Sequence, residues 1–203
     1  MNRVFLVTLT ALVAIPAAEA EPPTPGDLLT QADAAFYGKD APRDPAKALP
    51  LYAKACESGL AEACGEQAEI LYWGLGGVVV DKVKSRNLIK GARSGLDAAC
   101  TAGSARACLR LGFAYADGVG VVQDYPKAAA LDKKACDAGL GEACIYLGLF
   151  YAEGKGVDIN PARAHMLYVK ACQLGHAPAC EMGAVKALDT QVDPAPDAKS
   201  PEG

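Results

Sequence analysis

The chain has 203 residues, a formal net charge of −4, and 51% hydrophobic but only 6% aromatic residues. Its mildly acidic balance, without a dense cluster of Lys and Arg, disfavours a nucleic-acid or anionic-membrane surface. Because alanine is abundant and aromatic residues are few, closely packed helices are favoured over a sandwich of strands.

The amino terminus has the layout of a secretory signal peptide. Residues 1–3 are a short basic region, residues 4–15 are apolar, and Ala18-Glu19-Ala20 offers a small-x-small cleavage site. The apolar run is too short to span a bilayer, and no other segment approaches the length of a membrane span. We therefore expect residues 1–20 to be removed on export to the periplasm or the extracellular space of a bacterium.

The eight cysteines form four pairs with seven residues between the members, and a glycine follows the first cysteine of each pair by three positions. The pairs are Cys56/Cys64, Cys100/Cys108, Cys136/Cys144 and Cys172/Cys180, and the glycines are Gly59, Gly103, Gly139 and Gly175. Residues eight apart on a helix are separated by about 12 Å, whereas a disulfide needs Cα atoms within about 4.4–6.8 Å. If each pair is bonded, one helix must end at the glycine and the next must begin, with the bond across the corner.

The cysteines also mark a repeat of 36 residues, clearest in residues 108–144 and 144–180. Each unit contains two helical patterns. The first runs from the second cysteine to a Gly-x-Gly, and the second starts near Asp124 or Asn160, next to a proline. We predict helix pairs at about residues 28–63, 64–107, 108–143 and 144–179.

The ends of the array depart from the repeat. Leu28 stands where the first unit would carry a cysteine, as suits a terminal cap with no preceding unit to bond to. After Cys180 we expect a short capping helix from Glu181 to about Leu188, so that the solenoid covers residues 21–188. The prolines and charges of residues 189–203 are typical of a disordered tail.

The second unit is irregular, because Cys64 and Cys108 lie 44 residues apart. We favour pairing Cys100 with Cys108, which keeps the spacing and the glycine; the alternative is a bond from Cys100 to Cys64. The eight extra residues would lengthen a helix or add a turn of structure between units.

The motifs Leu-Gly-x-x-Tyr, Gly-x-Gly-Val, Asp-x-x-Lys-Ala and Ala-Cys-x-x-Gly-x-x-x-Ala-Cys resemble Sel1-like repeats, and the cysteine pairing is similar to that of the cysteine-rich Helicobacter proteins. The resemblance covers residues 28–182 and weakens in the second unit, at residues 74–81 and after Lys84. It implies an all-α fold, an αα-superhelical solenoid of TPR-like helix pairs stapled by disulfides, with a concave surface for partners.

Structural disulfides are the favoured role of the eight cysteines, each closing a nine-residue loop and contributing roughly 2.5 kcal/mol. Zinc is disfavoured, because pairs in successive layers would lie about 10 Å apart, too far to share one ion. Redox catalysis is disfavoured by the absence of Cys-x-x-Cys. We expect no metal and no other cofactor.

Other candidate residues are better explained by packing or solvation. Aromatic residues could line a groove, although core packing is favoured for them: Tyr52, Trp73, Tyr115, Tyr151 and Tyr168. The two histidines, His165 and His176, are eleven residues apart and are interpreted as solvated. Paired carboxylates on one helix face are not evident.

The resemblance also implies one enzymatic hypothesis, since relatives of this kind are linked to penicillin binding and β-lactam hydrolysis. The chain lacks Ser-x-x-Lys, Lys-Thr-Gly and Ser-Asp-Asn, so no catalytic residue is assigned. The leading hypothesis is an exported, monomeric scaffold whose superhelical groove binds a protein, peptide or cell-wall fragment. Weak β-lactam binding or hydrolysis is the alternative, and assembly of respiratory complexes in a mitochondrial intermembrane space is disfavoured by the secretory-type leader.

Overall fold

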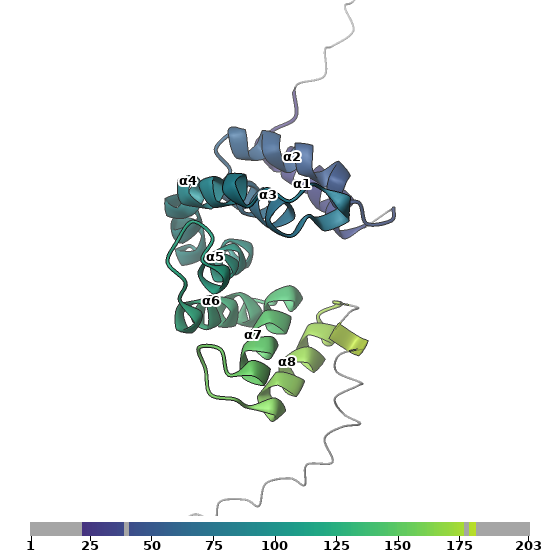
Figure 1. Ribbon diagram of the computed structural model, residues 1–203. Helices are drawn as coiled ribbons and strands as arrows, with labels where there is room; N and C mark the ends of the chain where they lie inside the picture. The colour runs from purple at the N-terminus through teal and green to yellow at the C-terminus, as the bar shows by residue number, and fades with distance from the viewer. Residues whose placement is uncertain (1–21, 39–40, 177–178, 182–203) are drawn as a thin grey trace, which may run out of the picture.

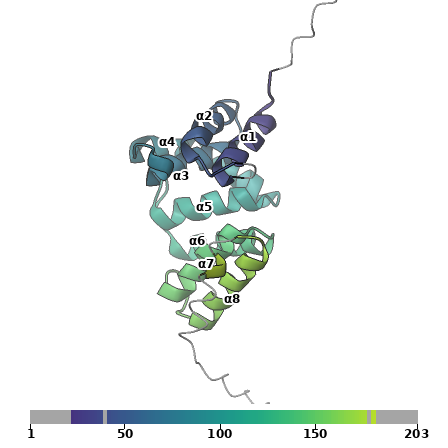
Figure 2. The same ribbon diagram turned by 90° about the vertical axis from the view of Figure 1, so that its right-hand side faces the viewer.

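The computed structural model of the chain describes residues 22–38, 41–176 and 179–181, and it is a stack of helix pairs. The pairs are α1 (Pro25–Tyr37) with α2 (Pro45–Glu57), α3 (Ala61–Trp73) with α4 (Lys82–Thr101), α5 (Ala105–Asp117) with α6 (Tyr125–Asp137), and α7 (Gly141–Glu153) with α8 (Pro161–Gln173). A short 3₁₀ turn, η1 (Leu75–Gly77), follows α3. Figure 1 shows the pairs following one another from α1 and α2 at the top to α7 and α8 at the bottom, and Figure 2 shows α5 crossing the middle of the stack.

All regular structure within these ranges is helical, which confirms the all-α solenoid. None of the helices that the structure describes is both long and apolar enough to cross a membrane. The predicted signal peptide, the capping helix beyond Glu181 and the tail at residues 189–203 lie outside the described residues.

The second helix of every pair begins at an Asp or Asn side chain. The caps accept a hydrogen bond from the backbone N–H three residues on, at 2.8–3.0 Å, and they are Asp44, Asp81, Asp124 and Asn160. Such a cap satisfies one of the backbone donors that the first turn of a helix leaves free. In α2, α6 and α8 a proline occupies the first or second position, where its missing N–H costs nothing.

The glycine that the cysteine spacing singled out stands two residues after the end of each second helix. Gly59, Gly103, Gly139 and Gly175 have φ between 85° and 103°. In each case the glycine N–H donates to the carbonyl of the first cysteine of the pair, at 2.9–3.1 Å. This left-handed conformation is unfavourable for residues with a Cβ, so the glycine turns the chain out of one helix and into the next.

Four disulfides bridge these turns. They join Cys56 to Cys64, Cys100 to Cys108, Cys136 to Cys144 and Cys172 to Cys180, and the Cα atoms of every pair are 4.7 Å apart. The first three tie α2 to α3, α4 to α5 and α6 to α7. The disulfides therefore connect one helix pair to the next rather than the two helices within a pair.

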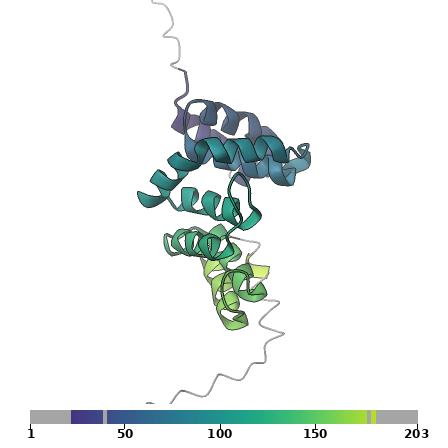
Figure 3. The same cartoon turned by 60° about the vertical axis from the view of Figure 1, so that its left-hand side comes forward.

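The eight extra residues of the second unit mostly lengthen α4. This helix has 20 residues, whereas α2, α6 and α8 have 13 each, and the loop before α4 takes up the remaining residue. Seven residues are close to two helical turns, so the same face of α4 stays in register with its neighbours. Ile89 and Leu96, seven apart, are both fully buried. In Figure 3 the long α4 crosses the front of the stack.

Candidate functional site

Side chains from three alternate helices meet around one buried arginine. Arg110 on α5 is 1% exposed; its Nε lies 3.6 Å from Oε1 of Glu66, and its Nη2 lies 2.9 Å from Oε1 of Glu142. Its Nη1 contacts Oε2 of Glu69. Glu66 and Glu69 on α3 are 1% and 4% exposed. One guanidinium is therefore shared by carboxylates from α3 and α7.

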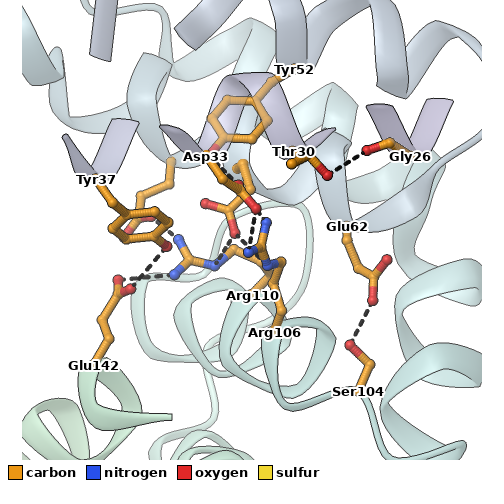
Figure 4. Close-up of polar contacts among 12 residues, drawn as sticks. Gly26, Thr30, Asp33, Tyr37, Tyr52, Glu62, Ser104, Arg106, Arg110 and Glu142 are labelled. Carbon is orange, nitrogen blue, oxygen red and sulfur yellow. Dashed lines mark hydrogen bonds and ion pairs between the residues drawn. The ribbon is translucent and has the colours of Figure 1, made fainter. Parts of the chain in front are cut away.

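A second arginine, one turn earlier on α5, connects α5 to α1. Both terminal nitrogens of Arg106 lie 2.7 Å from the two carboxylate oxygens of Asp33, and Tyr52 on α2 donates a hydrogen bond to the same carboxylate at 2.8 Å. The paired geometry fixes orientation as well as charge. Figure 4 shows Arg106 and Arg110 side by side below Asp33 and Tyr52.

Polar contacts around the two arginines also join helices that are far apart in the array. The hydroxyl of Tyr37 on α1 donates to Oε2 of Glu142 on α7 at 3.4 Å, although the two residues are 105 positions apart (Figure 4). Tyr146 on α7 donates to Glu69 on α3 at the same distance. First and fourth helix pairs thus meet on one side of the stack, which we call the inner side. The inner charge cluster is Asp33, Glu66, Glu69, Arg106, Arg110 and Glu142.

Electrostatically, the cluster holds four carboxylates against two guanidinium groups. Burial raises the pKa of Glu66, and Arg110 and Arg106 offset only part of that rise. Burial alone would lower the pKa of Arg110, but Glu66 and Glu142 outweigh it, so the pKa lies above its ordinary value and the guanidinium stays charged. Both carboxylate oxygens of Glu66 are buried and accept no hydrogen bond among the described residues. Arrangements of this kind fix geometry strongly and depend on every partner.

The expectation that no paired carboxylates share a helix face was wrong. Glu66 and Glu69 are three residues apart on α3, so they point to the same side. The repeated positions of the sequence do contain a signal for these buried ion pairs. Two positions before the second cysteine stand Glu62, Arg106 and Glu142, and two positions after it stand Glu66 and Arg110. This alternation of charge between units predicts ion pairs from one repeat to the next.

The aromatic residues divide between core and surface. Tyr52 and Tyr168 are fully buried and Tyr115 is 6% exposed, as core packing requires, and Tyr151 is partly buried. Trp73 is 50% exposed. His165 lies on α8 and His176 in the turn after it, and the described part of the chain contains no group of His, Cys, Asp or Glu that could hold a metal ion.

Trp73 lies at the edge of a cavity of about 260 Å³ between α3, α5, α6 and α7. We call this cavity the aromatic pocket; its walls include Trp73, Phe113, Tyr125, Tyr146 and Phe150. Its charged residues are Asp117, Asp132, Glu153 and Lys155. Because Tyr146 also donates to Glu69, the aromatic pocket adjoins the inner charge cluster.

A second depression, of about 710 Å³, runs along α4 beside the Cys56–Cys64 disulfide. Its charged lining residues, Asp81 and Lys84, form the cap of α4, where the Lys84 N–H donates to Asp81. The Asp81 carboxylate is already used by the helix cap, and no aromatic side chain lines this depression, so we place the candidate site at the aromatic pocket and the inner charge cluster.

The aromatic pocket contains a carboxyl group at a core position. Eight residues after the cap of α2, α4 and α8 stand Tyr52, Ile89 and Tyr168, all fully buried. The same position of α6 is Asp132, which is 2% exposed. Its carboxyl lies against Gly112 on α5, where a Cβ would collide with it, and its Oδ1 accepts no hydrogen bond from the described residues.

Burial raises the pKa of Asp132 well above its usual range. Arg110 on α5 opposes this rise, and Glu142 on α7 adds to it. The other titratable groups of the pocket are Asp117 on α5, Tyr125 at the start of α6, Tyr146 and Glu153 on α7, and Lys155 after it. An uncompensated carboxyl at this depth costs folding free energy whenever it is ionised in the unfolded chain.

Replacing Asp132 by asparagine is expected to stabilise the fold increasingly as the pH rises. The folded pKa is raised, so the wild type is least penalised below the unfolded pKa of about 3.9 and loses stability as the pH increases through the folded pKa. The advantage of Asp132→Asn should therefore be small near pH 4 and grow by up to about 1.4 kcal/mol per pH unit above it. Urea unfolding of both proteins from pH 4 to pH 8 measures this difference.

The matched control is Asp137→Asn on the same helix. Asp137 is exposed and pairs with Lys133 and Lys170, so its pKa lies below the ordinary value. Its substitution should change stability little and without the rise toward high pH. Equal pH profiles for the two variants would mean that Asp132 is hydrated in solution.

Comparison with known proteins places this geometry in a family. The family model of the Sel1 repeat matches the sequence at residues 32–60, 105–140 and 141–176, and it does not match the unit with the lengthened α4. A Sel1 repeat protein from Oxalobacter formigenes is 26% identical with a TM-score of 0.53, over 85% of this chain and 67% of that one. Cysteine-rich protein B from Helicobacter pylori is 32% identical with a TM-score of 0.44, over 67% of this chain and 92% of that one. No curated protein matches the chain.

The fold is that of a disulfide-stapled helical repeat scaffold. The chain belongs to the Sel1 repeat proteins, as its motifs predicted, and membership of this family supports a protein-binding role.

Proposed function

We propose that the protein is an exported scaffold that binds a segment of a protein or peptide along its inner side. The observation that carries the proposal is the half-exposed Trp73 at the edge of the aromatic pocket. Trp and Tyr at the edge of a concave, mostly apolar site are typical anchors for a partner.

The surroundings of the pocket favour a rigid binding surface. The inner charge cluster ties α1, α3, α5 and α7 together, and the disulfides fix each helix pair to the next. A surface that is already ordered loses little conformational entropy when a partner binds. Extended solenoid faces bind partners in this manner across several repeats.

Export is part of the proposal and rests on residues 1–20 and on the four disulfides. Disulfides persist in oxidising compartments such as the bacterial periplasm. The expected mature protein begins near Glu21 and is recovered in the periplasmic or extracellular fraction. Terminal sequencing of the exported protein checks this, and a cytoplasmic protein that retains residues 1–20 would contradict it.

Photo-crosslinking in the native host tests the binding site. With a benzoylphenylalanine at Trp73, we expect discrete adducts with one or a few partner proteins. The matched control carries the same group at Met166, which is 63% exposed on α8 and lies outside the aromatic pocket. Adducts at Trp73 but not at Met166 support the proposal.

Two outcomes count against this function. Equal labelling at Trp73 and Met166 would indicate unspecific contact with abundant proteins. A complete lack of adducts at Trp73, with the exported protein present at normal levels, would mean that the aromatic pocket does not face a protein partner.

A further inference from the structure

Asp132 gives the aromatic pocket a chemical preference. A tyrosine or an isoleucine at this position would fill the space between α5 and α6, as the matching side chains do in the other helix pairs. Here a shorter carboxyl lies against Gly112, and the cavity of about 260 Å³ remains. The departure from the repeat thus accounts for both the space and the buried carboxyl group, which ionises when a cation pairs with it.

The charges around the pocket are unbalanced. Asp117, Asp132 and Glu153 line it, and Lys155 is its one cationic group among the described residues. Lys155 is already engaged at the edge, where its Nζ lies 2.7 Å from Glu153 and 5.7 Å from the centre of the Tyr125 ring. No ion pair within 4.0 Å joins Asp132 to any cation in the part of the chain that is described.

We propose that the aromatic pocket receives the cationic end of a lysine or arginine side chain of the bound partner. The charge pairs with Asp132, and the methylene stem lies along the walls formed by Trp73, Phe113 and Phe150. This inference rests on the proposed function, because it assigns one side chain of the segment that the inner side binds.

The chemistry of the lining selects this class of ligand. Aromatic faces attract cations, most strongly where water is excluded, and aliphatic stems pack on the same surfaces. A buried carboxylate becomes favourable only when it gains a partner charge or donor. An anionic group would meet three carboxylates, and a purely apolar group would leave Asp132 unpaired.

Trp73 is the only tryptophan of the chain, so intrinsic fluorescence reports on this pocket. The probes are n-butylammonium and n-propylguanidinium, which reproduce the ends of the two side chains, and n-butanol as the neutral counterpart. At constant ionic strength we expect a saturable change in Trp73 fluorescence with either cation. Butanol should bind at least tenfold more weakly.

Asp132→Asn tests the pairing directly, and Asp137→Asn is its matched control. We expect Asp132→Asn to weaken cation binding at least tenfold and Asp137→Asn to leave it unchanged. Because Asp132→Asn is expected to stabilise the fold, the loss would not reflect unfolding. The shift of the melting temperature by each probe is a second readout, since a ligand that binds the folded state stabilises it by mass action.

Three outcomes would overturn the inference. The first is no response of wild-type fluorescence or melting temperature to either cation. The second is equal binding of cation and butanol, or binding that Asp132→Asn does not weaken. The third is cation binding to a Lys155→Met protein but not to the wild type, which would show that Lys155 fills the pocket itself.

Crosslinking separates this inference from the proposed function. If the crosslinker at position 73 captures a partner in the host while Asp132→Asn leaves capture and cation binding unchanged, the scaffold function stands. The assignment of a basic side chain to the aromatic pocket is then wrong. If the cations bind through Asp132 but Trp73 captures no protein, the proposed function fails and the pocket retains only its affinity for organic cations.

Discussion

Substituting Arg110 with methionine is expected to lower the free energy of unfolding by about 3–5 kcal/mol. Methionine has a similar length, so the packing volume is nearly kept while the charge is lost. Glu66 and Glu69 would then remain buried without the guanidinium that both now contact. Urea unfolding followed by circular dichroism, with the disulfides intact, measures the loss.

Arg93→Met is the matched control. Arg93 pairs with Asp97 on the surface of α4 at 3.8 Å, and both side chains are about half exposed. Such pairs contribute about 0–1 kcal/mol, so the same chemical change should have little effect there. A cost below about 1 kcal/mol for Arg110→Met would mean that water reaches the inner charge cluster and replaces the arginine.

A double substitution identifies the source of the effect. Adding Glu66→Gln to Arg110→Met removes one of the buried carboxylates that lose Arg110, which would keep only the contact of Arg106 Nε at 3.7 Å, so part of the stability should return. The difference from additivity isolates the coupling between the two side chains. Simple additivity would indicate that Arg110 stabilises the fold through packing alone.

The helical repeat could be predicted because its signals are local. Asp124 and Asn160 stand directly before helical patterns, and Gly59, Gly103, Gly139 and Gly175 stand where those patterns end. Caps and left-handed glycines act over three or four residues, so a single sequence contains all the information they need. The lengthening of α4 was one of two predicted outcomes for the extra residues. Seven added residues are close to two helical turns, so the same face of the helix stays buried.

The inner charge cluster could not be placed from the sequence alone. Tyr37 and Glu142 are 105 residues apart, and their contact depends on how tightly four helix pairs wind. The winding results from small rotations between successive pairs, which no local motif encodes. Alternation of Glu and Arg at matching repeat positions does indicate contacts between units, although not that α1 reaches α7.

The unusual position of Asp132 can be found by comparing the repeats with one another, but not from the composition of the chain. A carboxyl at a position that is Tyr or Ile in the other second helices breaks the local rule that fills the core. Such departures are expected where function requires a group that stability disfavours. The same substitution, Asp132→Asn, is therefore expected to raise stability and to lower cation binding.

Reduction of the four disulfides is expected to proceed in order of exposure. Cys180 is exposed, so the Cys172–Cys180 bond should be attacked first by a thiol reagent. Cys136 and Cys144 are both fully buried, so their bond should be the last to open. Partial reduction under native conditions, followed by alkylation and peptide mapping, gives the sequence of events.

Complete reduction should unfold the solenoid. Each nine-residue loop contributes roughly 2.5 kcal/mol in the chain-entropy model, so four contribute about 10 kcal/mol. That is comparable with the whole stability of an ordinary domain, about 5–15 kcal/mol. A helix pair here cannot bury its inner face alone, because Arg110 takes its partners from α3 and α7. Opening the bonds across the turns that connect the pairs should therefore remove the charge cluster and the aromatic pocket together. Helical circular dichroism and the fluorescence response of Trp73 to butylammonium should be lost in parallel. Retention of both after full reduction would mean that packing between repeats suffices without the bonds.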